Sequence, residues 1–412
     1  MARREFLHTV ILAMGGLSLA KSNLQSPATA APWSVRMADS TMARFPTLAE
    51  EWNYQWGLVL KGFEQVWRAT GDHKYFAYIQ SNIDRFVQPE GTIRGYRIEE
   101  YNVDRLNTGK VLFVLYEKTG EPRYKAALDL LRRQLDTHPR TQSGGFWHKQ
   151  IYPHQMWLDG IYMADAFYAQ YESVIANRVA AKQSPTSDLE IASAQEPRRA
   201  MTHWDDIAHQ IILVERHTRD EKTGLLYHAW DESKQQRWAN PVTGCSPHFW
   251  GRAIGWYGMA IVDVLDDMPR DHPQRDTVIA ILNRMCDALA RVQDAATGVW
   301  WQVLDQGARG GNYLESSGSC MFVYAMLKGV RNGYLPAACR TIAQRAYAGI
   351  IEQFVEVDAA GQAHLKNVCK SAGLGGTPYR DGSYEYYIHE PIVTDNHHGV
   401  GAFILASVEN EA

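Results

Sequence analysis

The chain has 412 residues, 45% of them hydrophobic and 21% charged, and its formal net charge is −4. These values are ordinary for a soluble globular protein and leave no basic surface for nucleic acid, so an acidic ligand would need a local cationic pocket. The 13 Trp and 21 Tyr suit stacking on sugar rings, although a large helical core would use them equally well.

The first 30 residues have the features of a targeting segment. Arg3-Arg4 precedes an apolar run from Thr9 to Ala20, and Ala28-Thr29-Ala30 matches a small-residue cleavage site. The paired arginines, followed by Phe-Leu, resemble a twin-arginine signal, and the apolar run is too short to span a bilayer comfortably. We therefore expect a periplasmic or secreted protein that starts near Ala31 and has no stable membrane association after cleavage. A plain secretory signal and an uncleaved anchor are the alternatives.

Helical periodicity dominates residues 31–412, which we interpret as one domain. Apolar residues recur there at steps of three and four, and Gly, Pro, Asn and Asp mark the breaks. The predicted helices are Trp52–Arg68, Lys74–Phe86, Asn102–Thr119, Pro122–Leu135, Gln155–Tyr171, Trp204–Arg216, Ala253–Asp267, Arg275–Gln293, Ser319–Asn332, Cys339–Phe354 and Asn396–Val408.

An internal repeat organises these helices into hairpins. Thr70-Gly71-Asp72-His73-Lys74-Tyr75 recurs as Thr119-Gly120-Glu121-Pro122-Arg123-Tyr124, and in both places one helix closes and the next opens. A spacing of about 50 residues predicts one hairpin per repeat and about six hairpins in all. Such hairpins form either an open solenoid or a closed α/α barrel, and periodicity alone does not decide between them.

Two further features bear on the organisation of the chain. The segment Ser173–Ala200 is rich in Ser, Gln, Pro and charge, and it reads as an inserted loop within the domain. The chain has five Cys, without a CxxC pair or a zinc-type spacing. Because twin-arginine substrates fold before export, where thiols stay reduced, we expect mostly free, buried thiols.

Several predicted loops combine aromatic residues with Asp, His, Lys or Arg. In a ring of helices the loops at one end carry the chemistry, and this composition indicates a sugar site with acid chemistry and an anion clamp. The segments are Asn102–Gly109, Gly145–Lys149, Gln155–Gly160, Tyr227–Asp231 and His248–Trp256.

Asp159 is the sharpest catalytic candidate in these loops. It follows Met156-Trp157-Leu158 at a predicted helix start. An aromatic, apolar setting would raise the pKa of its carboxyl, as a general acid requires. The alternative is a carboxylate that caps the helix.

The other candidates each have a structural alternative. Asp104 is either a second carboxylate of the site or a helix cap, and His228 is either a hydrogen-bond partner or an ordinary loop histidine. Lys149 and Arg252 are suited to bind a substrate carboxylate, or they form structural ion pairs. Trp250 and Trp256 either stack on sugar or pack in the core.

No sequence pattern indicates a metal or a cofactor. His389-Glu390 and His397-His398 lack the spacing of the helical zinc motif. The sequence contains no phosphate loop, dinucleotide fingerprint or nucleophile elbow. We therefore predict a site without metal or cofactor.

Three segments, taken in order, resemble glycoside hydrolase family 105, the unsaturated rhamnogalacturonyl hydrolases. They are Gln155-Met156-Trp157-Leu158-Asp159-Gly160-Ile161-Tyr162-Met163, Phe249-Trp250-Gly251-Arg252-Ala253-Ile254-Gly255-Trp256 and Glu315-Ser316-Ser317-Gly318-Ser319. The resemblance extends from about Trp52 to Ile404. It implies an all-α fold, a six-hairpin (α/α)6 barrel, and no metal.

The resemblance also assigns roles to residues. It implies that Asp159 is the general acid/base and that Asp104 lines the site as a second acidic contact. It implies that His228, Trp250 and Arg252 are site residues, and His148 and Lys149 lie in the matching loop. Together with Trp157 and Trp256, these are the predicted substrate-binding residues. The inserted loop Ser173–Ala200 departs from compact members of the family, which leaves the preferred substrate length open.

The implied substrate is a small oligosaccharide with a 4,5-unsaturated uronic acid at its non-reducing end, as polysaccharide lyases leave it. Rhamnogalacturonan fragments are the expected source. A related unsaturated glucuronyl hydrolase acting on ulvan, glycosaminoglycan or arabinogalactan fragments remains an alternative. So do a conventional inverting glycosidase using both Asp104 and Asp159, and a carbohydrate-binding helical-repeat protein. The oligomeric state is not indicated.

Overall fold

The computed structural model describes residues 31–48, 50–176, 202–307 and 309–412. The predicted targeting segment, residues 1–30, and most of the predicted inserted loop lie outside the described residues. Pro32–Ala412 forms one compact unit, and none of its described helices is long and apolar enough to cross a bilayer.

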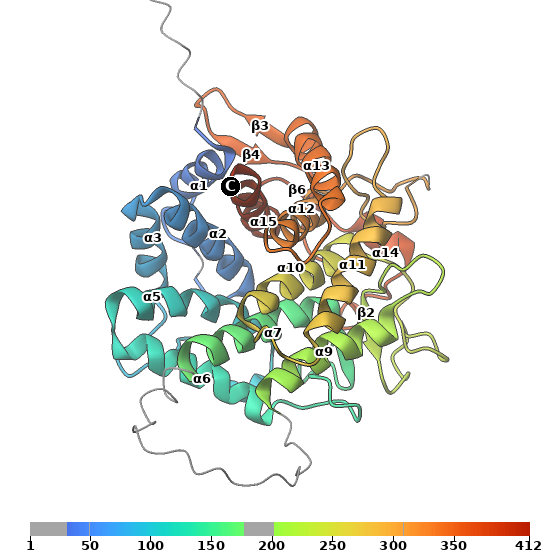
Figure 1. The fold of residues 1–412 in the computed structure, drawn as a ribbon, viewed down its shortest axis with the longest axis horizontal. Helices are drawn as coiled ribbons and strands as arrows, with labels where there is room; N and C mark the ends of the chain where they lie inside the picture. Colours follow the sequence, from blue (N-terminus) through green and yellow to red (C-terminus); the bar gives the residue numbers. More distant parts are fainter. Residues whose placement is uncertain (1–30, 49, 177–201, 308) are drawn as a thin grey trace, which may run out of the picture. The chain divides into compact units, whose positions relative to one another are not determined.

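The core of the fold is a ring of inner helices that pack against one another in sequence and then close on themselves. In Figure 1 the last of them, α15, lies beside the first, α2. A broken helical segment made of α4, η2 and α5 completes the ring between α2 and α7. The inner elements are α2 (Tyr54–Thr70), α4 (Asp104–Asn107), η2 (Thr108–Val111), α5 (Leu112–Thr119), α7 (Leu158–Tyr171), α10 (Gly251–Asp267), α12 (Ser316–Arg331) and α15 (His397–Glu411).

A second layer of helices surrounds this ring, each helix packed against an inner neighbour. The outer helices are α1 (Trp33–Arg44), α3 (His73–Ile83), α6 (Pro122–Thr137), α9 (His203–Thr218), α11 (Arg275–Arg291) and α13 (Ala338–Phe354). The described elements therefore form a closed (α/α)6 barrel, which confirms the all-α prediction and excludes the open solenoid.

The two layers differ in sequence because they differ in burial. Every residue of α12 from Ser316 to Gly329 is buried, as is every residue of α10 from Gly251 to Val262. Outer helices such as α11 bury only one face. A helix that is apolar on all sides belongs inside, whereas an amphipathic helix covers it.

The predicted hairpin turns are present and have the expected geometry. Gly71 ends α2 at φ 71° and Gly120 ends α5 at φ 69°, both in the left-handed region that favours glycine. Asp72 then caps α3 by accepting a hydrogen bond from the Lys74 backbone N–H, whereas Pro122 occupies the first position of α6.

Three details of the predicted elements were wrong. Gln155–Trp157 is not helical but forms strand β1, which pairs with β2 (Ala229–Asp231). The predicted helix Asn102–Thr119 is broken into α4, η2 and α5. The helix α1 (Trp33–Arg44) was not predicted, although it supplies the outer partner of α15.

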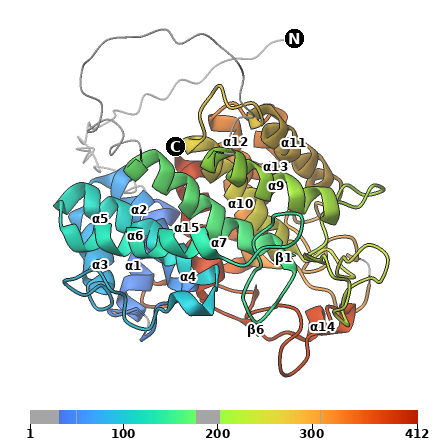
Figure 2. The ribbon, with the colours of Figure 1, turned by 90° about the horizontal axis from the view of Figure 1, so that it is seen from below.

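The connections at one end of the ring carry the short strands. Besides β1 and β2, β3 (Val355–Val357) pairs with β4 (Ala363–Leu365), and β5 (Val368–Cys369) pairs with β6 (Ile392–Val393). Helix α14 (Tyr384–His389) precedes β6. Figure 2 shows α4, α14 and β6 on the side of the molecule drawn at the bottom.

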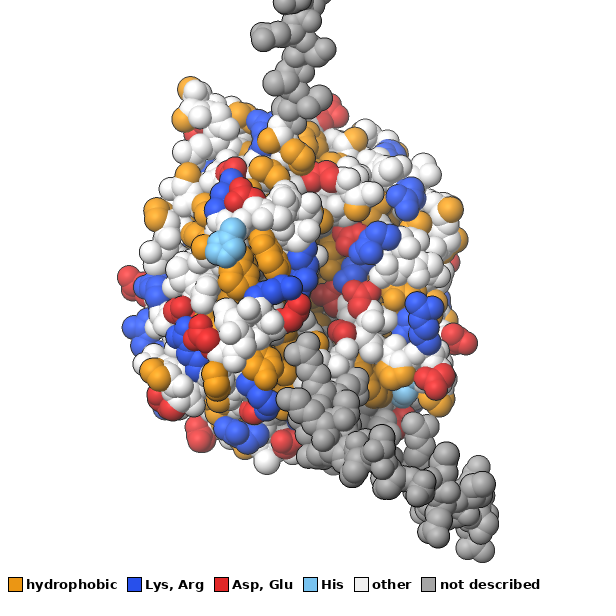
Figure 3. Space-filling view, turned by 60° about the vertical axis from the view of Figure 1, so that its left-hand side comes forward, with side chains coloured by type: hydrophobic (Ala, Val, Ile, Leu, Met, Phe, Trp, Pro, Cys, Tyr) orange, Lys and Arg blue, Asp and Glu red, His pale blue; other side chains and the backbone are white. Residues whose placement is uncertain are grey.

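The other end of the ring is occupied by charged side chains from the last turns of the inner helices. Lys328 of α12 forms ion pairs of 2.6 Å with Asp263 and 2.7 Å with Asp266 of α10. A cavity of about 260 Å³ in this region is lined by nearly balanced charges. Acidic and basic side chains are also interspersed on the face drawn in Figure 3.

The five cysteines are free and buried, as predicted. Two of them are neighbours, because the Sγ atoms of Cys286 on α11 and Cys339 on α13 lie 2.7 Å apart. The remaining three belong to separate parts of the core.

Candidate active site

The first turns of the inner helices converge at one end of the barrel. Asp104 and Tyr54 are the first residues of α4 and α2, whereas Asp159, Arg252 and His398 are the second residues of α7, α10 and α15. Because helix N-termini carry partial positive charge and unpaired N–H groups, this end of the ring favours a negatively charged ligand.

The Asp159 carboxylate has no structural role in the helix in whose first turn it lies. Among the described residues its buried Oδ2 atom has no hydrogen-bond partner and no side chain caps the first turn of α7, so the capping alternative is excluded. The Nε2 atom of His228 lies 3.2 Å from Asp159 Oδ2. A carboxylate held in place by neighbouring groups, yet not consumed by a cap, is available for proton transfer.

His228 is fixed from its other side by the loop that carries α14. Its Nδ1 atom and the Tyr387 hydroxyl are hydrogen-bonded at 2.7 Å, and both residues are fully buried. Burial holds the pKa of Tyr387 well above its usual value, so the hydroxyl keeps its hydrogen. When it donates to Nδ1, the imidazole hydrogen lies on Nε2 and faces Asp159.

Asp104 has a different environment. Lys149 Nζ lies 2.6 Å from its Oδ2 atom, and His148 Nε2 lies 3.4 Å from its Oδ1 atom. Burial opposes ionisation of Asp104, but Lys149 and His148 outweigh it and hold the pKa below the usual value. The cap of α4 comes instead from Asn102, whose Oδ1 accepts from the Asp104 backbone N–H. Asp104 is therefore an ionised, paired carboxylate.

Trp157 forms the centre of an aromatic stack beside these two carboxylates. Its ring stacks on His148 at a centroid distance of 4.4 Å and on Tyr152 at 5.0 Å, and its edge contacts His228 at 5.4 Å. Strand β1 fixes this arrangement, because Trp157 pairs there with Ala229, next to His228. Burial lowers the pKa of His148 to about 4, so this histidine is neutral near pH 7.

Arg252 lies beneath the site and is only 1% exposed. One guanidinium nitrogen donates to the Cys369 carbonyl oxygen at 2.6 Å and to Ser317 Oγ at 3.2 Å, whereas its Nε has no hydrogen-bond partner. Glu315 caps α12 through the Gly318 backbone N–H. Its nearby charge helps to raise the pKa of Arg252 against the effect of burial.

The two remaining predicted tryptophans are also buried. Trp250 lies 4.8 Å from the Arg252 guanidinium and 4.8 Å from the His228 ring centroid. Trp256 packs on Tyr162 at 4.8 Å and on Tyr54 at 6.4 Å. Trp250 therefore supports the site, whereas Trp256 packs in the ring just below it.

The structure thus brings the predicted residues to one end of the barrel and adds three that were not predicted. Tyr54 and His398 form a hydrogen bond of 2.8 Å between first turns, and Tyr387 holds His228. Asp104, Asp159 and Arg252 all lie at helix starts. A search for polar residues at the same positions of the other inner helices would have found Tyr54 and His398. Tyr387 lies outside the ring and has no such signal.

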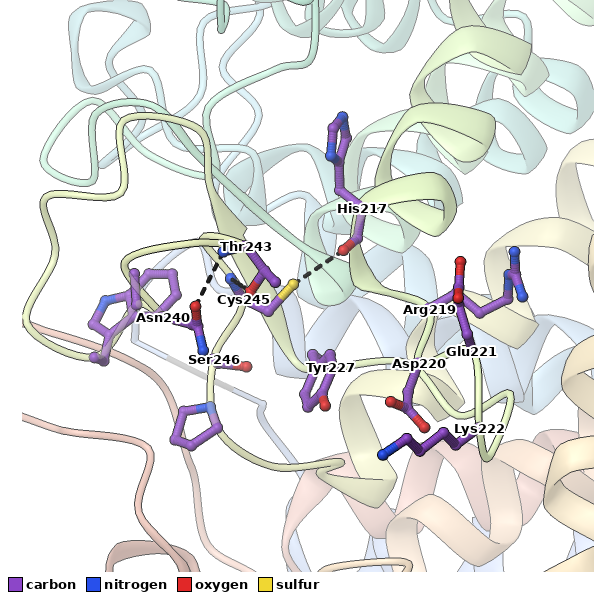
Figure 4. A pocket seen from close by; sticks show the side chains of 13 residues that line it. His217, Arg219, Asp220, Glu221, Lys222, Tyr227, Asn240, Thr243, Cys245 and Ser246 are labelled. Carbon is purple, nitrogen blue, oxygen red and sulfur yellow. Dashed lines mark hydrogen bonds between the residues drawn. The ribbon is translucent and has the colours of Figure 1, made fainter.

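Two surface cavities lie near these residues. One of about 440 Å³ is lined by Lys149 and Asn102 together with Arg97, Glu99 and Glu100. Another of about 720 Å³ contains none of the predicted site residues. Figure 4 shows Tyr227, Asp220 and Lys222 around this second cavity, with the His217 ring pointing away. Its Cys245 thiol is engaged, because Sγ donates to the His217 carbonyl oxygen at 3.0 Å.

The described residues contain no group of three His, Cys, Asp or Glu side chains placed to hold a metal ion. The pairs singled out in the sequence have other neighbours. His398 bonds to Tyr54, and His397 contacts Trp56 at a centroid distance of 3.5 Å.

Comparison with known proteins gives consistent results along the chain. A sequence model of Glycosyl Hydrolase Family 88 matches residues 33–184 and 192–412. The unsaturated rhamnogalacturonyl hydrolase YesR of Bacillus subtilis is 25% identical over 341 residues, which cover 80% of this chain and 84% of that protein. Protein Atu3128 of Agrobacterium fabrum is 41% identical over 193 residues, or 45% of this chain and 82% of that protein.

Solved structures share the fold. A glycoside hydrolase from family 105 of C. acetobutylicum is 48% identical, with a TM-score of 0.85 over 92% of this chain and 99% of that chain. The unsaturated glucuronyl hydrolase of Bacillus sp. GL1 is 11% identical with a TM-score of 0.64, over 92% of this chain and 95% of that chain. This second likeness concerns the fold alone.

Proposed function

Because this chain belongs to glycoside hydrolase family 105, we propose that it removes a 4,5-unsaturated uronic acid from the non-reducing end of lyase-generated oligosaccharides, with rhamnogalacturonan fragments as substrates. One observation carries the proposal. Asp159 is a carboxylate that caps no helix and lies 3.2 Å from His228, in an aromatic site at the N-terminal ends of the inner helices. The activity named for the Bacillus subtilis relative supports the choice of rhamnogalacturonan.

In the proposed reaction Asp159 acts first as acid and then as base. Its carboxyl group protonates carbon 4 of the unsaturated sugar, so positive charge develops at carbon 5 and the ring oxygen. The resulting carboxylate takes a proton from water, whose oxygen bonds to carbon 5 and forms a hemiketal. This step returns Asp159 to its protonated form. Opening of the hemiketal then moves its hydroxyl proton to the ring oxygen, and the hemiacetal left at carbon 1 collapses to an aldehyde and releases the aglycone.

The environment of Asp104 supports a mechanism with one acid/base residue. Its charge is already compensated by Lys149 at 2.6 Å and it faces His148 at 3.4 Å. A conventional inverting glycosidase needs a second carboxylate free to activate water directly at the anomeric carbon. Asp104 is better suited to hold sugar hydroxyls than to serve as that base.

The substrate carboxylate needs a positive site, and Arg252 is the better candidate for it. Lys149 is neutralised by Asp104, whereas the buried Nε atom of Arg252 has no hydrogen-bond partner in residues 31–48, 50–176, 202–307 and 309–412. The first turn of α10, which no side chain of the described residues caps, adds N–H groups and partial positive charge at the same place. An anionic sugar would therefore gain both a guanidinium and a helix N-terminus.

The test is the ultraviolet absorbance of the conjugated uronate during incubation with lyase-digested rhamnogalacturonan. Hydration of the double bond removes this absorbance, so the wild-type protein should make it fall. Asp159→Asn should lower kcat by about 10²–10⁴-fold without unfolding the protein. Asp136→Asn, at an exposed position of α6, is the matched control and should behave as wild type.

The substrates that the protein turns over distinguish between the remaining functional hypotheses. Turnover of lyase-cut ulvan or glycosaminoglycan but not of rhamnogalacturonan would move the assignment to the glucuronyl alternative. Turnover of saturated oligosaccharides would point to conventional hydrolysis. Near-normal turnover by a folded Asp159→Asn protein would reject the proposed role of this residue.

A further inference from the structure

A small internal cavity lies directly behind the stacked rings of Trp157 and His148. Its volume open to the centre of a water molecule is about 10 Å³, close to the ~10–15 Å³ that holds one water. The first two turns of α7 form one wall and Gln210 of α9 closes another. The lining residues are Val103, Phe146, Trp147, His148, Met156, Trp157, Gly160, Ile161, Ala164, Asp165 and Gln210.

Three lining residues have buried polar atoms for which the described part of the chain offers no hydrogen-bond partner. They are both carboxyl oxygens of Asp165, Nδ1 of His148 and Nε1 of Trp147. Asp165 is 1% exposed and His148 3%. A buried polar group left unpaired is destabilising, so groups of this kind on residues that line one cavity call for a common partner.

The donors and acceptors around the cavity are complementary. Burial, aided by the negative charge of Asp206 and opposed by Arg140, holds the pKa of Asp165 well above the usual carboxyl value, so its carboxyl is neutral and has an O–H donor. Trp147 Nε1 is a donor only. His148 is neutral because burial lowers its pKa to about 4.

The position of Asp104 decides which nitrogen of His148 carries the hydrogen. His148 Nε2 faces the ionised Asp104 at 3.4 Å, and a hydrogen on Nε2 is attracted by that charge. Nδ1 is then an acceptor that points to the cavity side, where a Cβ atom on Gly160 would lie only 3.0 Å from it. One water molecule that accepts from Asp165 and Trp147 and donates to Nδ1 would satisfy Nδ1, Nε1 and the O–H group of Asp165.

We propose that Asp165 is a positioning residue that, through one water bound in this cavity, fixes His148 in the tautomer with its hydrogen on Nε2 facing Asp104. The water site and the tautomer do not depend on the proposed function. The effect on turnover does, because it requires that Asp104 and the Trp157 stack hold the substrate. Gly160 leaves the space that this arrangement needs.

The first experiment measures the tautomer directly. Side-chain ¹H–¹⁵N spectra of histidine-labelled protein, with the His148 signal assigned by His148→Gln, should show hydrogen on Nε2 in the wild type and in Asp165→Asn, whose amide keeps an N–H donor. Asp165→Leu should lose this preference. Met163→Leu, a buried position of the same helix outside the cavity, is the control and should leave the signal unchanged.

A high-resolution crystal structure of the wild type gives a second, mutation-free readout. One ordered water within hydrogen-bond distance of Asp165, Trp147 Nε1 and His148 Nδ1 is expected. A dry cavity, or a wild-type His148 with its hydrogen on Nδ1, would overturn the proposal. A failure of Asp165→Leu to fold would leave both wild-type readouts decisive.

Kinetics then separate positioning from mere structural support. Asp165→Leu should lower kcat about tenfold with little change in KM, and Asp165→Asn should restore it. An equal loss of kcat in Asp165→Asn and Asp165→Leu would reject the proposal that a hydrogen-bond donor at position 165 acts through the bound water. If the wild type turns over none of the unsaturated oligosaccharides, the proposed function fails, and the spectra still decide the role of Asp165.

Discussion

Two carboxylates stand at helix starts in the site, and their neighbours give them different chemistry. Asp104 is paired with Lys149 at 2.6 Å and stays ionised, whereas Asp159 forms no ion pair with a Lys or Arg of the described residues and faces His228 at 3.2 Å. A carboxylate compensated by a fixed cation holds its charge but transfers protons poorly. The difference between the two residues is therefore set by side chains from other parts of the chain.

Tyr387 should affect activity through His228. Tyr387→Phe removes the 2.7 Å hydrogen bond to His228 Nδ1 and leaves that nitrogen unpaired. We expect kcat to fall about tenfold and the free energy of unfolding to fall by about 1–3 kcal/mol, measured by initial rates and urea unfolding.

The control for this change is Tyr384→Phe in the same helix α14. The Tyr384 hydroxyl donates to the Arg309 carbonyl oxygen at 3.0 Å, away from His228. It should lose stability without a comparable loss of kcat. Equal effects on kcat from both variants would show that Tyr387 acts only through the stability of α14.

The sequence contained the signal for part of the site and not for the rest. Asp159, Asp104 and Arg252 stand at helix starts beside aromatic residues, so pattern and periodicity place them at one end. The pairing of Asp104 with Lys149 depends on the bridge between Asn102 and Lys149, a contact between loops. Such contacts have no period in the sequence and become visible only when the ring is closed.

Close approach of helix backbones holds the ring together. A Cβ atom on Gly401 of α15 would lie 2.6 Å from Leu58 Cγ and 2.9 Å from the Leu58 carbonyl carbon in α2. Gly57 of α2 lies equally close to Thr108 in η2, where a Cβ would be 2.6 Å from Cα. Glycine at these positions lets neighbouring inner helices pack at backbone contact.

Gly401→Ala should therefore destabilise the barrel. The added methyl group meets backbone atoms that cannot rotate away, so α15 must shift from α2. We expect a loss of about 1–3 kcal/mol in the free energy of unfolding, measured by denaturant titration. Gly310→Ala, where a Cβ meets nothing within 4 Å, is the control, and a similar loss there would contradict the packing argument.

A histidine in β4 should make stability depend on pH. His364 Nδ1 lies 2.6 Å from Asp395 and its Nε2 lies 3.3 Å from Asp358. The hydrogen bond to Asp395, supported by Asp358 and opposed by burial and Arg44, raises the pKa of His364. The charged form is therefore favoured in the folded state.

The sign of the pH effect follows from this shift. Stabilisation by His364 is fully present below the ordinary histidine pKa of about 6.5 and is lost as the pH rises through the raised value in the folded protein. The difference in unfolding free energy between wild type and His364→Asn should shrink over that interval. A difference that grows with pH, measured by thermal unfolding in matched buffers, would contradict the assignment.

Most helices were predictable because each satisfies a local rule. Apolar spacing found eleven of them, and Gly71 and Gly120 marked their ends. Gln155–Trp157 failed because a strand of three residues that runs into a helix continues the apolar pattern without a break. Helix α1 failed because its burial comes from α15, at the far end of the chain.

One end of the barrel favours a charged ligand, whereas the charged side chains at the other end neutralise one another. The first turns of the inner helices meet around Asp159, whereas their last turns meet around ion pairs such as Lys328 with Asp263. Because parallel helix starts add their partial charges, a carboxylated sugar is attracted to a single mouth. The direction of the inner helices thus determines at which end of the barrel the candidate active site lies.

We propose that the chain is exported through its N-terminal arginine pair, which lies outside the described residues. Fusion of residues 1–31 to a reporter should direct it to the bacterial periplasm, and Arg3→Lys with Arg4→Lys should retain it in the cytoplasm, measured by cell fractionation. Unchanged export of the double variant would indicate a general secretory signal instead. Cysteines that are buried and free are compatible with folding in a reducing compartment before export.

The junction between α1, α2 and α15 carries a consequence for how the protein is made. The backbone N–H of Ser34 donates to Glu411 at 3.1 Å, and α15 packs against both α1 and α2. Residues 397–411 must therefore be synthesised before α1 and α2 find this partner, and until then both helices keep apolar faces uncovered. Closure of the barrel joins segments more than 300 residues apart in sequence, and contacts so distant form slowly.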